Sequence, residues 1–185
     1  IERLGISAVI MEDKTGLKKN SLLTDTSNQS QEDIVTFSEK IKTAKINQQN
    51  SDLMIIARIE SFILGKGIDD ALLRAKSYVN SGSDAIMIHS KKNKPYEIFD
   101  FSKKFKKEFN NIPLVCVPST YSSVKESELI ENGFNIVIYA NHLFRAAYPA
   151  MVKTAESILT NERSKEIEDK LTSIKDMMDL IPGTN

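Results

Sequence analysis

Six polar side chains that could do chemistry follow short apolar runs in the chain. They are Glu12, Arg58, Glu60, His89, Ser90 and Asn141. Carboxylates can bind a metal or accept a proton, and an arginine guanidinium can grip a carboxylate or phosphate at two points. An imidazole can transfer a proton near neutral pH. Residue types and spacing therefore indicate an enzyme site that binds an anion and in which a metal could assist.

Arg58 and Glu60 are two positions apart, directly after the apolar run 54–57. Side chains at this spacing on an extended strand point the same way, with Ile59 opposite. Arg58 could hold a substrate carboxylate or phosphate while Glu60 orients it, or the two could form a purely structural ion pair. Both interpretations stay open at the level of residues and spacing.

The other candidates also have structural alternatives. Glu12 and Asp13 offer the hard oxygen ligands that magnesium prefers, but two carboxylates alone do not make a metal site. The alternative is an acidic surface paired with Lys14. His89 ends a different apolar run, and a lone histidine is often a hydrogen-bonded structural group. Its expected place on the same sheet edge as Arg58 favours a functional role.

Five apolar runs have the length and β-branched content of strands buried on both faces. They cover residues 9–11, 54–57, 85–88, 114–117 and 136–140, and helical patterns such as 31–47 separate them. Strand–helix alternation predicts a parallel sheet whose carboxyl ends share one edge, where active sites sit in barrels and open sheets alike. Five strands fit an open doubly wound sheet, or the last five strands of an eight-stranded barrel.

Composition excludes several classes of protein. The 185 residues carry 25 basic and 25 acidic side chains, so net charge gives no reason to expect nucleic acid or an anionic membrane as a partner. No apolar stretch approaches the roughly 20 residues of a membrane-spanning helix. The one cysteine, Cys116, excludes a disulfide framework, which makes a reducing cytoplasm the simplest compartment. No zinc-ligand spacing, Ser-His-Asp pattern or glycine-rich nucleotide loop is visible.

Three segments lie outside the simple strand–helix pattern. Residues 1–5 read as the last turn of a helix, so we expect the chain to be part of a longer protein. The polar stretch 15–30 is long for a connection, which is typical of a lid or of a disordered surface loop. The helices predicted over 141–181 carry more apolar surface than one strand–helix repeat needs, and we expect this surface to pack on a partner subunit.

Five motifs at or beside the predicted sheet edge, together with the C-terminal tail, resemble the phosphoenolpyruvate phosphomutase family, within the phosphoenolpyruvate mutase/isocitrate lyase superfamily. The motifs are Met11-Glu12-Asp13-Lys14, Lys18-Lys19-Asn20-Ser21, the run 56–62, the run 85–92 and the run 139–146, and the tail is 168–175. The resemblance implies an α/β (β/α)8 barrel with a swapped C-terminal helix, of which residues 1–185 hold about the last five strands. It also implies a homo-oligomer, a dimer or tetramer formed by exchange of helices 141–181.

The resemblance further implies an isomerase that interconverts phosphoenolpyruvate and phosphonopyruvate in phosphonate biosynthesis, with Mg²⁺ as cofactor. Glu12 matches a carboxylate that holds magnesium through water. Lys18, Asn20 and Ser21 match a gating loop over the substrate, with Lys18 and Asn20 catalytic and Asn20 and Ser21 binding substrate. Arg58 and His89 match groups that hold the substrate's anionic ends and the transferring phosphoryl group.

Related activities differ from this one at the loop 17–21. Isocitrate and methylisocitrate lyases carry a catalytic cysteine in a Lys-Arg-Cys-Gly-His loop, whereas this chain reads Leu-Lys-Lys-Asn-Ser there, which argues against a lyase. Phosphonopyruvate hydrolase is the alternative, since it tends to carry threonine where this chain has Asn20. The family's phosphoryl-accepting and main metal-ligating aspartates sit on the first barrel strands, which we expect to be missing here. A chain that is natively this short would instead be a non-catalytic oligomerisation or binding remnant.

Overall fold

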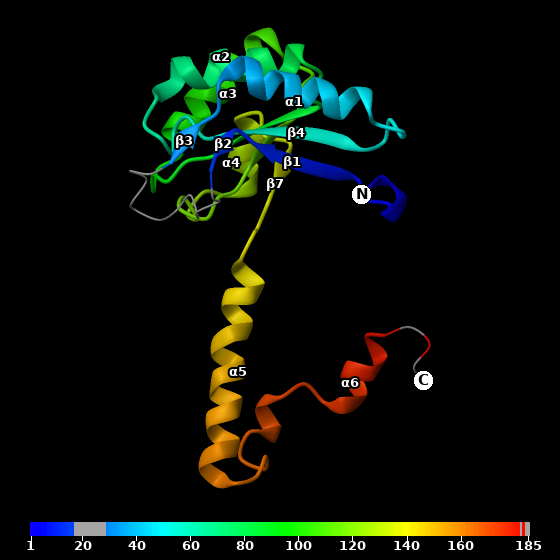
Figure 1. The fold of residues 1–185 in the computed structure, drawn as a ribbon. Coiled ribbons are helices and arrows are strands. Elements are labelled where there is room, and N and C mark those ends of the chain that lie inside the picture. Colours follow the sequence, from blue (N-terminus) through cyan, green and yellow to red (C-terminus); the bar gives the residue numbers. More distant parts are fainter. Residues whose placement is uncertain (17–28, 182, 184–185) are drawn as a thin grey trace. The chain divides into compact units, whose positions relative to one another are not determined.

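The computed structural model describes residues 1–16, 29–181 and 183. The chain forms two compact units, Ile1–Ala140 and Asn141–Asn185. The first unit contains the sheet and four α-helices, and the second contains the C-terminal helices (Figure 1). The candidate residues Lys18, Asn20 and Ser21 lie outside the described residues.

The core of the first unit is a five-stranded parallel sheet in the order β1-β4-β5-β6-β7. Its strands are β1 (Ala8–Glu12), β4 (Met54–Ile59), β5 (Ala85–Ile88), β6 (Leu114–Cys116) and β7 (Ile136–Val137). All five predicted strands are present and parallel, so the predicted α/β class is confirmed. The three central strands are almost wholly buried, whereas the edge strands β1 and β7 are partly exposed.

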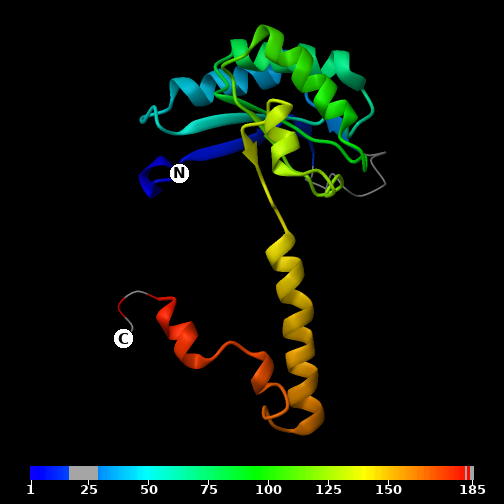
Figure 2. The same ribbon diagram turned by 180° about the vertical axis from the view of Figure 1, so that it is seen from behind.

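Helices connect the strands. They are α1 (Ile34–Ile46), α2 (Gly67–Asn80), α3 (Tyr96–Glu108) and α4 (Glu126–Glu131), and the short 3-10 helix η1 (Glu2–Leu4) precedes β1. Figures 1 and 2 show α1, α2 and α3 lying over one face of the sheet. Their apolar side chains, among them Phe37, Tyr78 and Phe101, pack with Ile59 and Ile86 of the strands into the main core.

The opposite face of the sheet carries a smaller apolar cluster. It consists of Ile56, Ala85, Met87, Val115 and Val117. These residues alternate along their strands with those of the main core, as the two-residue period of a strand requires. Side chains at even positions of β4 and odd positions of β5 therefore face this second cluster. We call this side of the sheet the inner face and the helix-covered side the outer face.

Helix α1 begins three residues later than the predicted segment 31–47. Asp33 caps it, because its Oδ1 accepts hydrogen bonds from the backbone N–H groups of Val35 (2.9 Å) and Thr36 (3.1 Å). Residues Ser30–Gln31 form strand β3, which pairs antiparallel with β2 (Lys14–Thr15). This two-stranded ribbon removes Gln31 from the predicted helix, since its backbone pairs with Lys14 in the ladder.

The second unit contains α5 (His142–Asn161), η2 (Glu168–Lys170) and α6 (Ile174–Asp179). No residue of α5 is buried, and large apolar side chains such as Leu143 (86% exposed) and Phe144 (71%) are exposed. Among the described residues, none of the helices combines the length and apolarity that crossing a bilayer requires.

Candidate active site

The carboxyl ends of β1, β4 and β5 bring the predicted charged residues together. In the parallel ladders Glu12 is paired with Arg58, and Arg58 with Met87. Because side chains alternate along each strand, Glu12, Arg58 and His89 point to the inner face, in line with Ile56 and Met87 of its apolar cluster. The expected convergence on one sheet edge is therefore present for these three residues.

Four charged side chains form a closed ring at this edge, which we call the charge quartet: Glu12, Lys14, Arg58 and Glu60. The Nη2 and Nε atoms of Arg58 each lie 2.7 Å from Glu60 Oε1, and Lys14 Nζ lies 3.2 Å from Glu60 Oε2. Glu12 Oε1 lies 3.4 Å from Lys14 Nζ and 3.5 Å from Arg58 Nη2. Cations and carboxylates thus alternate around the ring, so each charge has neighbours of opposite sign.

The quartet is largely removed from water. The side chain of Glu60 is fully buried, that of Lys14 is 3% exposed and that of Arg58 is 17% exposed. Charges buried in this way keep their ionised form only when they are paired, and their mutual attraction is stronger than at the surface. The structure contains the predicted Arg58–Glu60 ion pair. This pair orients the Arg58 guanidinium at the carboxyl end of β4, on the inner face of the sheet.

His89 lies beside the quartet and is only 4% exposed. Burial, together with the positive charges of Arg58 and Lys14, lowers the pKa of His89 from 6.5 to about 4, against the opposing effect of Glu60. The imidazole is therefore neutral at pH 7. Its Nδ1 atom has no hydrogen-bond partner among the described residues. A buried polar atom without a partner is costly, which marks His89 as a group that can receive a ligand.

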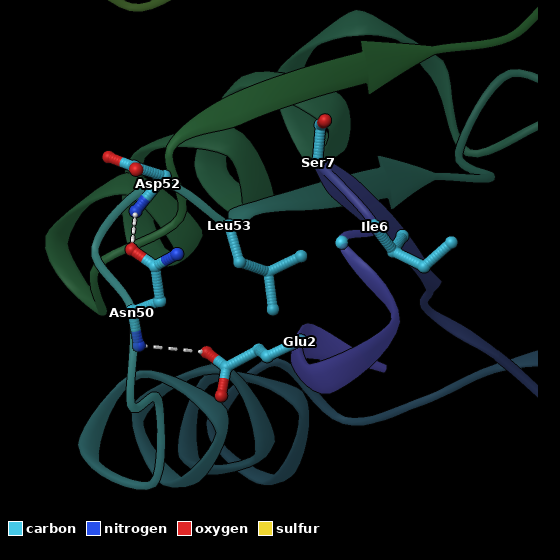
Figure 3. Close-up of a pocket in the computed structure, with 7 residues that line it drawn as sticks. Glu2, Ile6, Ser7, Asn50, Asp52 and Leu53 are labelled. Atoms are coloured by element: carbon cyan, nitrogen blue, oxygen red, sulfur yellow. Dashed lines mark hydrogen bonds between the residues drawn. The ribbon is translucent and has the colours of Figure 1, made fainter.

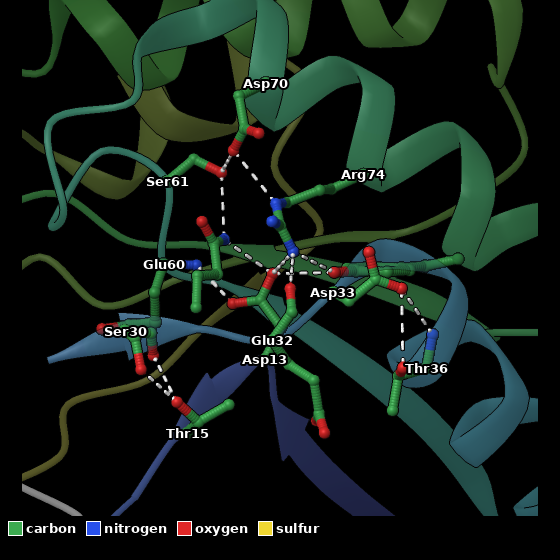
Figure 4. Close-up of polar contacts among 12 residues, drawn as sticks. Asp13, Thr15, Ser30, Glu32, Asp33, Thr36, Glu60, Ser61, Asp70 and Arg74 are labelled. Atoms are coloured by element: carbon green, nitrogen blue, oxygen red, sulfur yellow. Dashed lines mark hydrogen bonds and ion pairs between the residues drawn. The ribbon is translucent and has the colours of Figure 1, made fainter.

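Asp13 faces the opposite way from Glu12. Its fully buried carboxylate accepts hydrogen bonds from the backbone N–H of Glu60 (3.0 Å), from Gln31 Nε2 (2.7 Å) and from the α2 side chains Tyr78 (2.9 Å) and Arg74 (3.3 Å). Burial raises the pKa of Asp13, although these donors lower it. The contacts with α2 place Asp13 on the outer face (Figure 4). Glu12 and Asp13 therefore do not share one site, because adjacent residues of an extended segment point to opposite faces.

The other predicted residues lie elsewhere. Ser90 is buried, and its hydroxyl is hydrogen-bonded to Glu97 of α3, so it helps to hold that helix rather than face the quartet. Asn141 is the first residue of the second unit. Sequence reasoning missed Lys14, which it treated as a surface partner of acidic residues. The two-residue spacing of Glu12 and Lys14, the same as that of Arg58 and Glu60, was the available signal.

Two of the hollows formed by the described residues lie at opposite ends of the strands. One, of about 230 Å³, is lined by Ile10, Glu12, Lys14 and Gly16 and therefore opens beside the quartet. The other, also about 230 Å³, lies at the amino ends of β1 and β4 (Figure 3). There the Glu2 carboxylate already accepts hydrogen bonds from the backbone N–H groups of Gln49 and Asn50. Of these two hollows, the one beside the quartet adjoins cationic side chains, Lys14 and Arg58, that could receive an anion.

A divalent cation is usually held by several oxygen or nitrogen ligands. No group of three or more His, Cys, Asp or Glu side chains that could enclose a metal occurs within residues 1–16, 29–181 and 183. Glu12 nevertheless lines the hollow beside the quartet with a carboxylate, the hard oxygen donor that Mg²⁺ prefers. A single carboxylate at this hollow fits the role that the resemblance implies for Glu12, which is to hold Mg²⁺ through bridging water.

The chain is similar to known proteins along most of its length. The sequence profile described as phosphoenolpyruvate phosphomutase matches residues 1–159. A phosphoenolpyruvate phosphomutase of Tetrahymena pyriformis is 40% identical over 97% of this chain and 59% of its own length. The crystal structure of a phosphoenolpyruvate phosphomutase from Streptomyces platensis subsp. rosaceus superposes with a TM-score of 0.89 at 37% identity, covering 97% of this chain and 61% of that one.

A related enzyme with a different activity is also similar. A crystal structure of a phosphonopyruvate hydrolase in complex with oxalate and Mg²⁺ superposes with a TM-score of 0.84 at 35% identity, covering 97% of this chain and 60% of that one. The chain thus spans about three fifths of the length of the relatives that it matches. Its five-stranded α/β unit corresponds to part of a TIM-type barrel, as predicted. The chain belongs to the phosphoenolpyruvate phosphomutase family.

Proposed function

We propose that the full-length protein is a phosphoenolpyruvate phosphomutase, an isomerase that interconverts phosphoenolpyruvate and phosphonopyruvate in phosphonate biosynthesis. The observation that carries the proposal is the placement of Arg58, held by Glu60, beside a buried neutral His89 on the inner face. Phosphoryl transfer depends mainly on positioning and on charge stabilisation in a site shielded from water. The names of the 40% and 37% identical relatives support the mutase assignment.

Each residue would have a distinct role. The Arg58 guanidinium would bind an anionic end of the substrate, and Glu60 would keep it oriented. His89, neutral at pH 7, would donate one hydrogen bond to the transferring phosphoryl group without adding charge. Lys18, Asn20 and Ser21 would contact the same substrate from the segment 15–30, outside the described residues.

Magnesium would be the cofactor, with Glu12 holding it through bridging water. When bound, Mg²⁺ would neutralise negative charge on the phosphoryl oxygens during transfer. The complex of the related hydrolase with oxalate and Mg²⁺ supports this assignment. In this chain Lys14 would keep the Glu12 carboxylate beside the hollow, since its ammonium group lies 3.4 Å from Glu12 and 3.2 Å from Glu60.

Phosphonopyruvate hydrolase is the second candidate, because a hydrolase is 35% identical to this chain. The residue that favours the mutase is Asn20, which stands where the hydrolase tends to carry threonine. Phosphorus NMR of the full-length protein with phosphonopyruvate and Mg²⁺ separates the two activities. We expect phosphoenolpyruvate as the product, and none when the metal is chelated. Free phosphate would identify a hydrolase, and an unchanged substrate would overturn both assignments.

We also propose that the helices of 141–181 are exchanged between the subunits of a dimer or tetramer. The support is the apolar surface of α5, where Leu143 and Phe144 are 86% and 71% exposed. Light scattering of the full-length protein should give a dimer or tetramer, and Leu143→Glu with Phe144→Glu should lower the mass to that of a monomer. Lys153→Glu, on the same helix, is the matched control that should leave the mass unchanged. A monomeric wild type would contradict the proposal.

A further inference from the structure

The carboxylate of Asp13 is fully buried on the outer face, behind the charge quartet. Its two oxygens accept hydrogen bonds from different donors. Oδ1 accepts the backbone N–H of Glu60 at 3.0 Å, and Oδ2 accepts the side chains of Gln31, Tyr78 and Arg74 at 2.7, 2.9 and 3.3 Å. Four donors thus converge on one side chain that does not itself face the inner side of the sheet (Figure 4).

The backbone of Asp13, like its side chain, is hydrogen-bonded to the carboxyl end of β4 and to the residues at β3. Its N–H donates to the carbonyl oxygen of Arg58 at 3.1 Å, and its carbonyl oxygen accepts the N–H of Glu32 at 2.7 Å. Asp13 therefore fixes the end of β1 against the end of β4, where Glu12 and Lys14 leave one strand and Arg58 and Glu60 leave the other. A shift at this point would change the spacing of all four quartet residues.

The groups that hold Asp13 are themselves fixed. Arg74, which is 4% exposed, donates from Nη1 to the carbonyl oxygen of Glu32 at 2.8 Å and from Nε to Asp70 at 3.0 Å. Asp70 also accepts the Ser61 hydroxyl at 2.6 Å. The three side-chain donors to Asp13 each contact a further group, since Gln31 also donates to Ser61 and Arg74 also donates to Tyr78. The network therefore resists movement of any one member and anchors Asp13 to α2.

We propose that Asp13 is a positioning residue that sets the spacing of the charge quartet and, through Glu60, the direction of the Arg58 guanidinium. Its effect on turnover depends on the proposed function, whereas its effect on the geometry of Arg58 does not. This role differs from metal ligation, because the carboxylate faces the outer side and each of its oxygens already accepts hydrogen bonds.

Asparagine has the size of aspartate but cannot replace it here. Both carboxylate oxygens of Asp13 accept hydrogen bonds, whereas an amide has a single acceptor oxygen. If the amide NH₂ took the place of Oδ1, it would face the Glu60 N–H, which is also a donor. If it took the place of Oδ2, it would face the three side-chain donors of that oxygen. Asp13→Asn therefore keeps the volume and disturbs the acceptor pattern, which moves the strand ends apart.

The test is NMR of the full-length protein labelled with ¹⁵N-arginine, because the Arg58 Nε–H donates to Glu60 at 2.7 Å and reports on that contact directly. The Arg58→Lys variant assigns the signal by its disappearance. In Asp13→Asn we expect this signal to move or broaden, and kcat/KM to fall about tenfold, as for a displaced catalytic group. Combined with Arg58→Ala, Asp13→Asn should add little further loss.

Asp84→Asn is the matched control. Asp84 also accepts a β4 backbone N–H, that of Ile55 at 2.7 Å, and pairs with Lys45 at 2.9 Å, but at the amino end of the strand. It should lower stability without moving the Arg58 signal. If Asp13→Asn fails to fold, Tyr78→Phe removes one of its four donors and should displace the same signal by less.

Three outcomes would overturn the inference: an Arg58 signal that stays unchanged in both Asp13→Asn and Tyr78→Phe, an equal displacement in Asp84→Asn, or fully additive losses with Arg58→Ala. A wild-type protein without turnover would overturn the proposed function alone. The NMR comparison would still decide the role of Asp13 in that case, since it needs no substrate.

Discussion

Replacing Arg58 with alanine should lower kcat/KM of the full-length protein for phosphonopyruvate about 1,000-fold, as is typical when a preorganised donor to a transition-state anion is removed. Arg58 is the group of the quartet that combines permanent positive charge with several N–H donors at the inner face. Its loss would also leave the buried Glu60 carboxylate with Lys14 as its cationic neighbour in the quartet, so part of the effect would be a disturbed site.

The Arg58→Lys variant distinguishes the contribution of the positive charge from that of the planar guanidinium group. It keeps the positive charge but loses the planar fork, and we expect most of the activity to remain lost. A coupled enzyme assay of phosphoenolpyruvate formation gives the rates. Circular dichroism checks that each variant is folded. Lys76→Ala is the control, since this half-exposed lysine of α2 pairs with Glu108 away from the site. Arg58 variants with wild-type kinetics would remove Arg58 from the proposed mechanism.

Acid should destabilise the protein through His89 over a defined range of pH. The pKa of His89 is about 4 in the folded chain and about 6.5 in an unfolded one. Between these values the unfolded state binds a proton that the folded state does not. The free energy of unfolding therefore falls as the pH is lowered from about 6.5 to about 4, by about 3 kcal/mol in total for this group.

Urea unfolding at several pH values, for wild type and His89→Gln, measures this difference. The His89→Gln variant lacks the titrating group, so its stability should fall less with acid. Asp13, whose pKa burial raises, contributes equally to both proteins and cancels in the comparison. An NMR titration gives an independent check: the imidazole signal of His89 should stay constant down to about pH 5. A midpoint near 6.5, or parallel stability curves, would show that His89 is not held neutral by its surroundings.

The sequence by itself determined the elements and the edge at which the chemistry gathers. The lengths of the apolar runs and the helical spacing between them are local properties, and they predicted five parallel strands correctly. Parallel strands place all carboxyl ends together, and this rule alone predicts that Glu12, Arg58 and His89 meet at one edge. The motifs around these residues also identified the family, which the comparisons confirm.

Tertiary structure alone decided which face each charged side chain meets. Alternation along a strand requires Glu12 and Asp13 to point apart, but it does not say which side is covered by helices. Tyr78 and Arg74, which are more than 60 positions away along the chain, bind Asp13 on the helix-covered face. Glu12 therefore lies on the inner face. The buried Lys14 likewise pairs with Glu60, a residue that directly follows another strand, β4. Such contacts follow from the packing of whole elements, which local patterns do not encode.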